Sequence, residues 1–274
     1  MTKVAIVTGS NKGIGLAIVR GLCKKFDGDV YILARNVDRG QEAVKLLEKE
    51  GLHPKIHQFD VCDVTSIERL RDFMTSQYGG IDVLVNNAGI AYNSTDPVPM
   101  AKKAEDCVRT NYIGTVDASR ILFPVVRDGG RIVNVSSTLS IMYLKKLSDE
   151  NQKFFRSKSL TEEELTAKME EFVESTRKGT VVEDGFVEQP YGMSKVGMSA
   201  LTFVWARKLK SMGKNDVIIN AVCPGWVRTD LGGEKASRTP DQGAEAPIYL
   251  ATLPAGVKSP NGEFVSSEKN IKEW

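Results

Sequence analysis

"TGSNKGIG", residues 8–15, is the stretch that decides the fold, because it places three glycines and a lysine directly after the apolar run VAIV. Glycine permits a tight turn and lets backbone amides approach a ligand closely. A helix that begins here would direct its first amides and the positive end of its dipole toward an anion. The spacing Gly9, Gly13, Gly15 is not that of the general fingerprint G-x-G-x-x-G, but the physical reason is the same. The stretch predicts a phosphate-binding strand-to-helix turn; the alternative is a merely tight connection.

Strand-like apolar runs alternate with helical patterns along the rest of the chain. Most of these runs are continuously apolar, which is typical of strands covered on both faces. Repeated strand–helix units predict a single Rossmann-like α/β fold, a doubly wound parallel sheet with helices on both faces. Such sheets bind ligands beyond the carboxyl ends of their strands. The expected strands are residues 3–9, 29–35, 55–61, 81–88, 130–137 and 216–225, with 262–267 as a last edge strand.

One segment interrupts this alternation, because residues 138–189 contain no convincing strand. A helix is expected within it, since Thr161 and Glu164 fit a capping box. The same helix would carry an apolar stripe made by Leu165, Met169, Phe172 and Val173. No linker or repeat divides the chain. We therefore expect residues 1–274 to form one domain with a helical insertion at about 138–189.

The composition is that of an ordinary globular protein, with 41% hydrophobic and 26% charged residues. A net charge of +2 without a basic cluster argues against nucleic acid or an anionic membrane as partner. The start of the sequence leaves no room for a leader, and no window approaches the length of a membrane span. A cytoplasmic protein is expected. Zinc sites and disulfides are not expected, because the cysteines lie far apart at Cys23, Cys62, Cys107 and Cys223.

The residue about 20 positions past a glycine turn selects the cofactor, since an acid there binds a ribose hydroxyl and a base accommodates a 2′-phosphate. In this chain the second strand ends at Arg35. Lys12, inside the turn, offers a second cation. Together they favour NADP over NAD; the alternative is that both are solvated surface charges.

The segment YGMSK places Tyr191 and Lys195 four residues apart, on one face of an expected helix. Tyrosine has an ordinary pKa near 10, and a neighbouring ammonium favours the phenolate. The pair could therefore exchange a proton with a substrate. By itself the spacing is common by chance.

Further motifs follow one another along the chain: NNAG at 86–89, NYIGT at 111–115, NVSS ending at Ser137, and CPGWVRTD from Cys223. In this order, together with the glycine turn and YGMSK, they resemble the short-chain dehydrogenase/reductase family over essentially the full length. The resemblance implies hydride transfer between a nicotinamide cofactor and a carbonyl or alcohol carbon. It also implies that the catalytic residues are Asn111, Ser137, Tyr191 and Lys195.

In that family pattern each of the four residues has a role. Tyr191 would exchange a proton with the substrate oxygen, and Lys195 would lower the pKa of Tyr191 and hold the nicotinamide ribose. Ser137 would hydrogen-bond the carbonyl, with Ser136 as the alternative serine, because residues alternate along a strand. Asn111 would position a water in the proton relay; alternatively it caps or kinks a helix.

The resemblance also implies cofactor contacts along the carboxyl ends of the strands. Asp60 and Val61 would meet the adenine, unless Asp60 is an ordinary strand-end aspartate. The loop after Cys223 would close over the nicotinamide. The full set of implied contacts is Gly9, Asn11, Lys12, Gly13, Ile14, Gly15, Arg35, Asp60, Val61, Asn87, Gly89, Tyr191, Lys195, Pro224, Gly225, Val227 and Thr229.

The insertion before Tyr191 makes the chain similar to the NADPH-dependent carbonyl reductases of animals, the monomeric branch of the family. A monomer is expected, because an extra helix would obstruct the surface through which other members associate. The implied reaction is reduction of quinones, ketones or aldehydes, with glutathione adducts of carbonyl compounds as candidate ligands by resemblance only. The expected substrate contacts are Ser137, Tyr191 and Trp226, the last as an aromatic wall or else as simple packing.

Two alternatives remain open at this point. A steroid, prostaglandin or alkaloid dehydrogenase of the same family would share all these motifs, since specificity is set by pocket contacts worth only a few kcal/mol. A cofactor-binding regulator that has lost its chemistry would share the fold.

Overall fold

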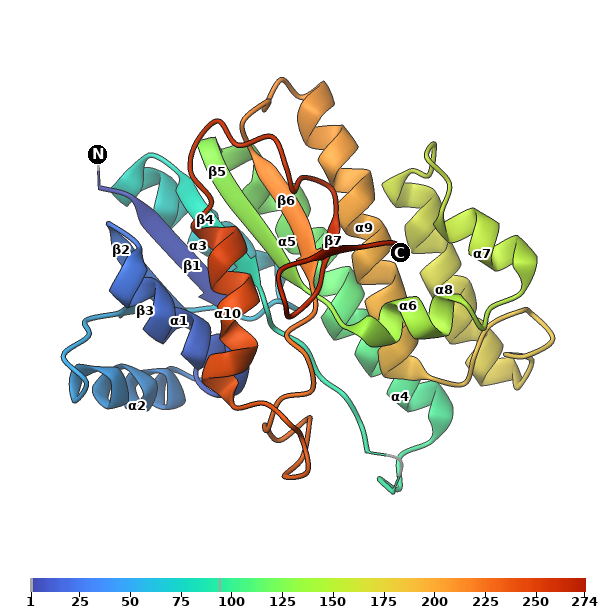
Figure 1. Cartoon of the computed structure of the whole chain (residues 1–274). Coiled ribbons are helices and arrows are strands. Elements are labelled where there is room, and N and C mark those ends of the chain that lie inside the picture. Colours follow the sequence, from blue (N-terminus) through green and yellow to red (C-terminus); the bar gives the residue numbers. More distant parts are fainter. Residues whose placement is uncertain (1, 94) are drawn as a thin grey trace.

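The computed structural model describes residues 2–93 and 95–274 and builds them around one β-sheet (Figure 1). The strands follow the order β3-β2-β1-β4-β5-β6-β7-β8, and every pair is parallel except β7 with β8. The doubly wound fold expected from the sequence is confirmed. The strands are β1 Val4–Thr8, β2 Asp29–Ala34, β3 Lys55–Gln58, β4 Ile81–Asn86, β5 Val126–Val135, β6 Ile218–Val222, β7 Phe264–Val265 and β8 Ile271–Lys272.

Helices cover both faces of the sheet (Figure 1). One layer contains α1, α2 and α10, and the other contains α3, α4, α5 and α9. The helices are α1 Gly13–Lys25, α2 Val37–Glu48, α3 Val64–Tyr78, α4 Met100–Cys107, the π-helix η1 Val108–Ile113, α5 Gly114–Leu122, the short η2 Phe123–Val125, α6 Thr138–Leu144, α7 Asp149–Phe155, α8 Glu162–Lys178, α9 Pro190–Ser211 and α10 Pro240–Ala251.

The order of the strands reverses between β1 and β4, because β1 pairs with β2 on one side and with β4 on the other. In open α/β sheets this reversal opens a crevice at the carboxyl ends of the strands. The glycine turn follows β1 and NNAG follows β4, so the two motifs meet at that crevice. The sheet thus brings together segments far apart in the sequence.

Two strand predictions need correction. The segment 262–267 is not the edge of the sheet, because only Phe264 and Val265 form β7, and β8 pairs antiparallel outside it. A tight turn makes this hairpin, with Lys269 at φ 67° and the amide of Ser266 donating to Asn270. Such short strands leave too little alternation to recognise. The fifth strand also begins earlier than residue 130, at Val126, and its register against β4 shifts there.

The insertion is helical, as predicted, and contains α6, α7 and α8. The capping box of α8 is present, since Thr161 and Glu164 bond each other's backbone amides. The apolar stripe of α8 is buried, and the helix packs on α4, η1 and α9. At its first residue, Glu162 is buried and pairs with Arg120 of α5 at 2.5 Å. The insertion is therefore packed into the helical layer.

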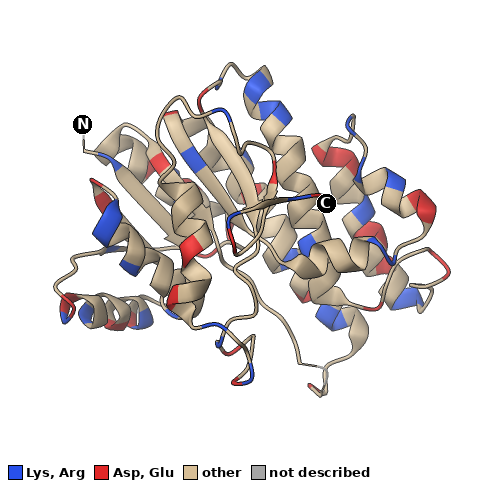
Figure 2. Ribbon diagram, viewed as in Figure 1, with Lys and Arg blue, Asp and Glu red and all other residues tan. Residues whose placement is uncertain are grey.

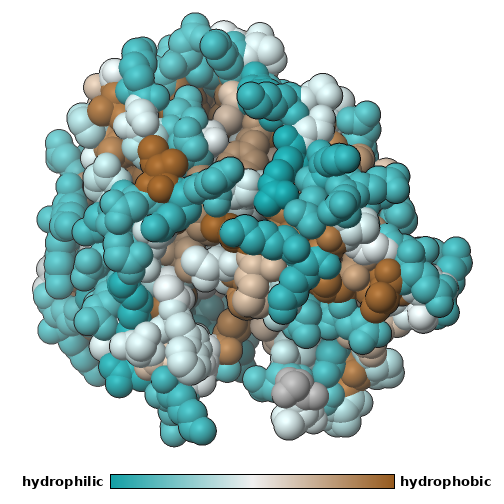
Figure 3. Space-filling view, turned by 45° about the vertical axis from the view of Figure 1, so that its right-hand side comes forward, coloured by the Kyte–Doolittle hydropathy of each residue, from teal (hydrophilic) through white to brown (hydrophobic). Residues whose placement is uncertain are grey.

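Basic and acidic residues are interspersed along the ribbon in Figure 2. Hydrophilic groups dominate the view in Figure 3, apart from scattered apolar patches and a hollow along the lower edge. Among the residues that the structure describes, no helix combines the length and hydropathy needed to cross a membrane.

Replacing Phe172 by Ala is expected to lower the free energy of unfolding by about 3–5 kcal/mol, because a buried ring leaves a cavity. Phe172 is fully buried in α8, and its ring centroid lies 5.6 Å from that of Phe186. Urea unfolding followed by circular dichroism measures the change. As a control, Val182→Ala removes a side chain that is 72% exposed in the same insertion, and should change the free energy by less than about 0.5 kcal/mol. Equal effects of the two substitutions would contradict the packing of α8.

Candidate active site

The glycine turn lies directly against the end of β4. Gly9 has φ 61°, and a β-carbon there would lie 2.8 Å from Ala88 Cα, so no larger residue fits without a shift. The side-chain amide of Asn87 donates to the backbone carbonyls of Thr8 and Gly9 at 2.9 and 3.1 Å. Thr8 Oγ1 in turn accepts from the backbone amides of Asn87 and Ala88. These bonds fix the turn. The first backbone amides of α1, which lack intrahelical acceptors, therefore lie at the crevice.

The two cations predicted to bind a 2′-phosphate both lie on the surface beside this turn. Lys12 precedes α1, and its side chain is 66% exposed and forms an ion pair with Asp230. Arg35 is exposed directly after β2, and its carbonyl accepts from Gln58 at 3.4 Å. Both side chains can therefore reach a phosphate at the carboxyl ends of β1 and β2.

The residues expected to meet the adenine lie after β3. Asp60 Oδ1 accepts from the amide of Cys62 at 2.9 Å, so this carboxylate holds the turn that leads into α3. Val61 is buried, and its carbonyl would lie 2.8 Å from a β-carbon on Gly114. In this structure Asp60 acts as the strand-end aspartate that the alternative interpretation described.

The two serines that end NVSS face different neighbours, as alternation along a strand predicts. Ser136 Oγ is buried and lies 2.7 Å from Ser199 Oγ of α9. Ser137 is the N-cap of α6, where its Oγ accepts from the amide of Leu139 at 3.2 Å. Ser137 thus marks the point at which β5 turns into α6.

Tyr191 and Lys195 project from the first turns of α9, which begins with Pro190. Lys195 is 3% exposed, and its Nζ donates to the carbonyl of Val135, the last residue of β5, at 2.7 Å. The same Nζ lies 5.7 Å from the centroid of the Tyr191 ring. The tyrosine, the lysine and Ser137 are therefore gathered at the end of one strand.

Burial controls the protonation of this pair. It raises the pKa of Tyr191 above its ordinary value, and a hydrogen bond with Ser137 acts in the opposite direction. It lowers the pKa of Lys195 to about 8, against the influence of Cys107 and Cys223. Burial is the largest influence on the pKa of Tyr191 in this structure, and the lowering of that pKa by Lys195 stays a prediction.

Asn111 lies in the π-helix η1, where the amide of Gly114 bonds the carbonyl of Arg109. Its side chain accepts from the amide of Ile90 at 2.7 Å and donates to Ser194 Oγ of α9 at 2.9 Å. Single turns of π-helix occur frequently at functional sites. The arrangement ties the segment after β4 to the helix that carries the tyrosine.

Gly89 leaves the space between β4 and these side chains open. A β-carbon at this position would lie 3.1 Å from Asn111 Oδ1 and 3.7 Å from Lys195 Nζ. The structure therefore brings Gly89, Asn111 and Lys195 together, as the motifs predicted. A side chain larger than that of glycine would fill this gap.

The loop between β6 and α10 lies directly beside the glycine turn. Thr229 Cγ2 would lie 3.3 Å from a β-carbon on Gly13, and Val227 is buried. Trp226 is 57% exposed, and its Nε1 donates to the carbonyl of Gly232 at 2.8 Å. The indole is thus fixed to its own loop with its ring toward solvent. Pro224 and Gly225, at φ 84°, begin the same loop.

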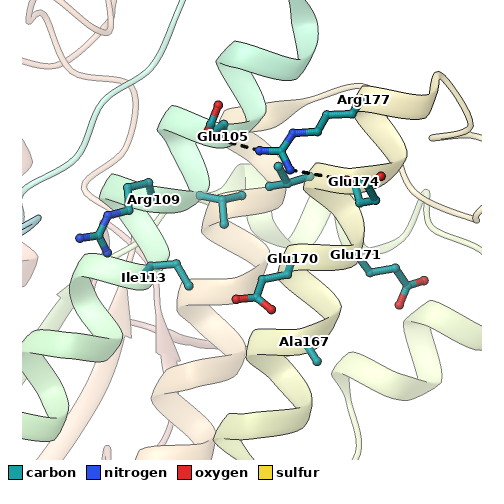
Figure 4. Close-up of a pocket in the computed structure, with 10 residues that line it drawn as sticks. Glu105, Arg109, Ile113, Ala167, Glu170, Glu171, Glu174 and Arg177 are labelled. Carbon is teal, nitrogen blue, oxygen red and sulfur yellow. Dashed lines mark hydrogen bonds and ion pairs between the residues drawn. The ribbon is translucent and has the colours of Figure 1, made fainter.

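A separate groove of about 550 Å³ lies between η1 and α8 (Figure 4). Arg177 reaches across it and pairs with Glu105 and Glu174 at 3.4 and 3.5 Å. Among the described residues that line it, none belongs to the predicted catalytic or cofactor set. The groove is therefore a feature of the insertion and lies apart from the strand ends.

Sequence reasoning missed two polar residues that hold the site together. Thr8 joins the ends of β1 and β4 through its hydroxyl, and Ser194 joins Asn111 to α9. Ser194 lies inside the YGMSK segment, and Thr8 begins the glycine stretch. Their types and positions were visible, but their partners are about 80 residues away.

The chain belongs to the short-chain dehydrogenase/reductase family. The family model described as short chain dehydrogenase matches residues 3–148, which include the glycine turn and Ser137. The order of the sheet and the geometry at the ends of β1, β4 and β5 agree with that assignment.

Among curated proteins, carbonyl reductase (NADPH) 1 of Homo sapiens is 52% identical over 272 residues, covering 99% of this chain and 98% of the human protein. The Rattus norvegicus protein of the same name is 49% identical over 272 residues, again covering 99% and 98%. Among solved structures, salutaridine reductase from Papaver somniferum has a TM-score of 0.85 at 29% identity, covering 96% of this chain and 99% of that one. Menthone neomenthol reductase from Mentha piperita has a TM-score of 0.81 at 31% identity, covering 97% and 99%.

The buried amine of Lys195 should titrate at pH about 8, far below the ordinary value for lysine near 10.4. Its ammonium form dominates at lower pH and is lost as the pH rises through that value. Carbon-13 NMR of protein labelled at the lysine ε-methylene measures this, and the Lys195→Met variant identifies the signal by its disappearance. The signal of exposed Lys49 serves as the internal reference with which the titration of Lys195 is compared. Titration of Lys195 together with the exposed lysines would contradict its burial.

Proposed function

We propose that the protein reduces the carbonyl groups of quinones, ketones and aldehydes with NADPH, and that Tyr191 donates the proton to the substrate oxygen. The observation that carries the proposal is the convergence of Ser137, Tyr191, Lys195 and Asn111 at the end of β5. It is supported by about half of the residues being identical to mammalian NADPH-dependent carbonyl reductases across the whole chain.

The glycine turn fits a dinucleotide. The close approach of Gly9 to Ala88 leaves room for no side chain at that point, and the first turn of α1 directs its amides outward. Gly9, Gly13 and Gly15 would hold the pyrophosphate, while Lys12 and Arg35 would bind the 2′-phosphate. When bound, the cofactor supplies the hydride, and the protein supplies orientation and polarisation.

The protonation states suit reduction. Because burial raises the pKa of Tyr191, the phenol is protonated at neutral pH and can donate its proton. Ser137 bonds the same hydroxyl, so the two side chains can address one carbonyl oxygen. Lys195, as an ammonium below pH about 8, would hold the ribose and complete the proton relay with a water positioned by Asn111.

The substrate class is the part of the proposal with a close alternative. Both plant structures named above belong to reductases of an alkaloid or a terpenoid, by their names. Their identity to this chain, 29% and 31%, is well below the 52% of human carbonyl reductase, which favours the broader carbonyl class. A silent regulator is disfavoured because all four catalytic residues are present. Trp226, exposed on the loop beside the crevice, would form one wall for the substrate.

We also propose that the chain acts as a single-domain cytoplasmic monomer. The support is that α8 packs on α4, η1 and α9. By the family resemblance, other members associate through this surface, and α8 would obstruct it. Glutathione adducts of carbonyl compounds remain candidate ligands on the same grounds of resemblance.

Tyr191→Phe should lower kcat for menadione reduction by about 10²–10⁴-fold, because the phenyl ring cannot donate a proton. Loss of NADPH absorbance measures turnover, and cofactor fluorescence measures binding, which should stay within about twofold because the hydroxyl is not required for it. Tyr249→Phe in α10 makes the same change on a partly exposed tyrosine and should leave turnover unaffected. A Tyr191→Phe enzyme that keeps most of its turnover would refute the role of proton donor.

Arg35→Ala should weaken NADPH binding by about tenfold and leave NADH binding within about twofold, because only NADPH carries the 2′-phosphate. Fluorescence titration with each cofactor gives the two dissociation constants. Lys49→Ala, at the far end of α2, removes an exposed charge of the same sign and should change neither constant. Equal weakening of both cofactors by Arg35→Ala would rule out its role in selectivity.

A further inference from the structure

Trp274 lies beside the catalytic helices although it is the last residue of the sequence. Its Nε1 donates to Ser140 Oγ in the first turn of α6 at 3.0 Å. Its ring centroid lies 5.1 Å from that of Phe203 in α9, at an angle of 64° between the rings. The indole thus contacts both the helix that Ser137 caps and the helix that carries Tyr191.

The position of Trp274 is held from two directions. The β7–β8 hairpin precedes it and pairs Val265 with Ile271, which fixes the backbone at the edge of the sheet. Arg156, at the end of α7, donates from Nε to the carbonyl of Trp274 at 3.3 Å. The segment that ends at Trp274 is therefore docked on α6, α7 and α9.

The hydrogen bond to Ser140 begins a chain of buried hydroxyls. Ser199 Oγ donates to Ser140 Oγ at 3.1 Å, and Ser136 Oγ lies 2.7 Å from Ser199 Oγ. All three serines are buried. An indole N–H can only donate, so Ser140 accepts from Trp274. Ser136 Oγ donates to the carbonyl of Lys195 at 3.4 Å, and either hydroxyl can be the donor in its contact with Ser199.

The row of buried hydroxyl groups ends next to Ser137, the proposed catalytic serine. Ser136 is the neighbour of Ser137, and the amide of Ser140 donates to the carbonyl of Ser137 at 2.9 Å. The donors from Trp274 and Ser199 therefore meet on the helical turn whose N-cap is Ser137. Both bonds hold that turn toward α9, where Tyr191 and Lys195 lie.

We propose that Trp274 is a positioning residue for carbonyl reduction, because its indole N–H holds the first turn of α6, and with it Ser137, against α9. It acts through Ser140 and touches neither the reacting atoms nor the glycine turn. This inference rests on the proposed function, since the position of Ser137 matters only if Ser137 bonds the substrate carbonyl.

Trp274→Phe tests the proposal, because phenylalanine keeps an aromatic ring beside Phe203 and removes the N–H. We expect kcat for menadione to fall by about fivefold, with the KM for NADPH within about twofold, since the loss falls on the reacting geometry alone. The matched control is Trp205→Phe in α9. Among the described residues Trp205 Nε1 has no hydrogen-bond partner, and its ring meets that of Phe123 edge to face with centroids 4.7 Å apart. This control should leave kcat within about twofold even if it lowers the melting temperature.

A double-mutant cycle separates positioning from general loosening. Ser140→Ala alone should lower kcat at least as much as Trp274→Phe, and the double variant should be no worse than Ser140→Ala, because Ser140→Ala already removes the bond from Trp274 together with the one from Ser199. A normal kcat in Trp274→Phe, or losses that multiply in the double variant, would overturn the proposal. If Trp274→Phe does not fold, a normal kcat in Ser140→Ala overturns it instead. Wild-type protein without turnover would refute the proposed function itself.

Discussion

The hydrogen bond from Lys195 to the carbonyl of Val135 is the contact on which the candidate site depends. It joins α9 to the last residue of β5, and the chain continues from there through Ser136 into Ser137. A lysine that is 3% exposed requires a partner, because a buried ammonium without one is costly. The bond therefore fixes the distance between the helix that carries the tyrosine and the strand that carries the serine.

A second constraint comes from backbone packing at the ends of β1 and β4. Gly9 and Ala88 approach so closely that the turn tolerates no side chain, and Asn87 and Thr8 bond across the two strands. These contacts hold the first turn of α1 beside Gly89, which in turn lies next to Asn111 and Lys195. A cofactor placed on the turn is thus directed toward the catalytic side chains by the sheet itself.

The helical insertion supports the same arrangement from outside. Its helix α8 packs on η1 and α9, the elements that carry Asn111, Tyr191 and Lys195. Its helix α6 begins at Thr138, directly after its N-cap Ser137, so the insertion starts beside one of the proposed catalytic residues. Between η1 and α8 lies the groove of Figure 4, which Arg177 of α8 crosses to pair with Glu105 of α4.

The sequence by itself determined the doubly wound sheet, the helical insertion with its capping box, and the set of residues that meet at the strand ends. The sheet and the insertion follow from local patterns, because apolar runs, glycine turns and caps act over a few residues. The set of site residues came from the resemblance of the motifs to the family. Only the tertiary structure decided the direction of the pKa shift of Tyr191, the pairing of Lys12 with Asp230, the turn role of Asp60, and the edge strand β8. The pKa shift of Tyr191 depends on burial, and the ion pair of Lys12 depends on a partner 218 residues away. The turn at Asp60 and the strand β8 are local, but their sequence patterns are too short to recognise. The contact of Trp274 with Ser140 joins residues 134 positions apart, so folding alone could reveal it.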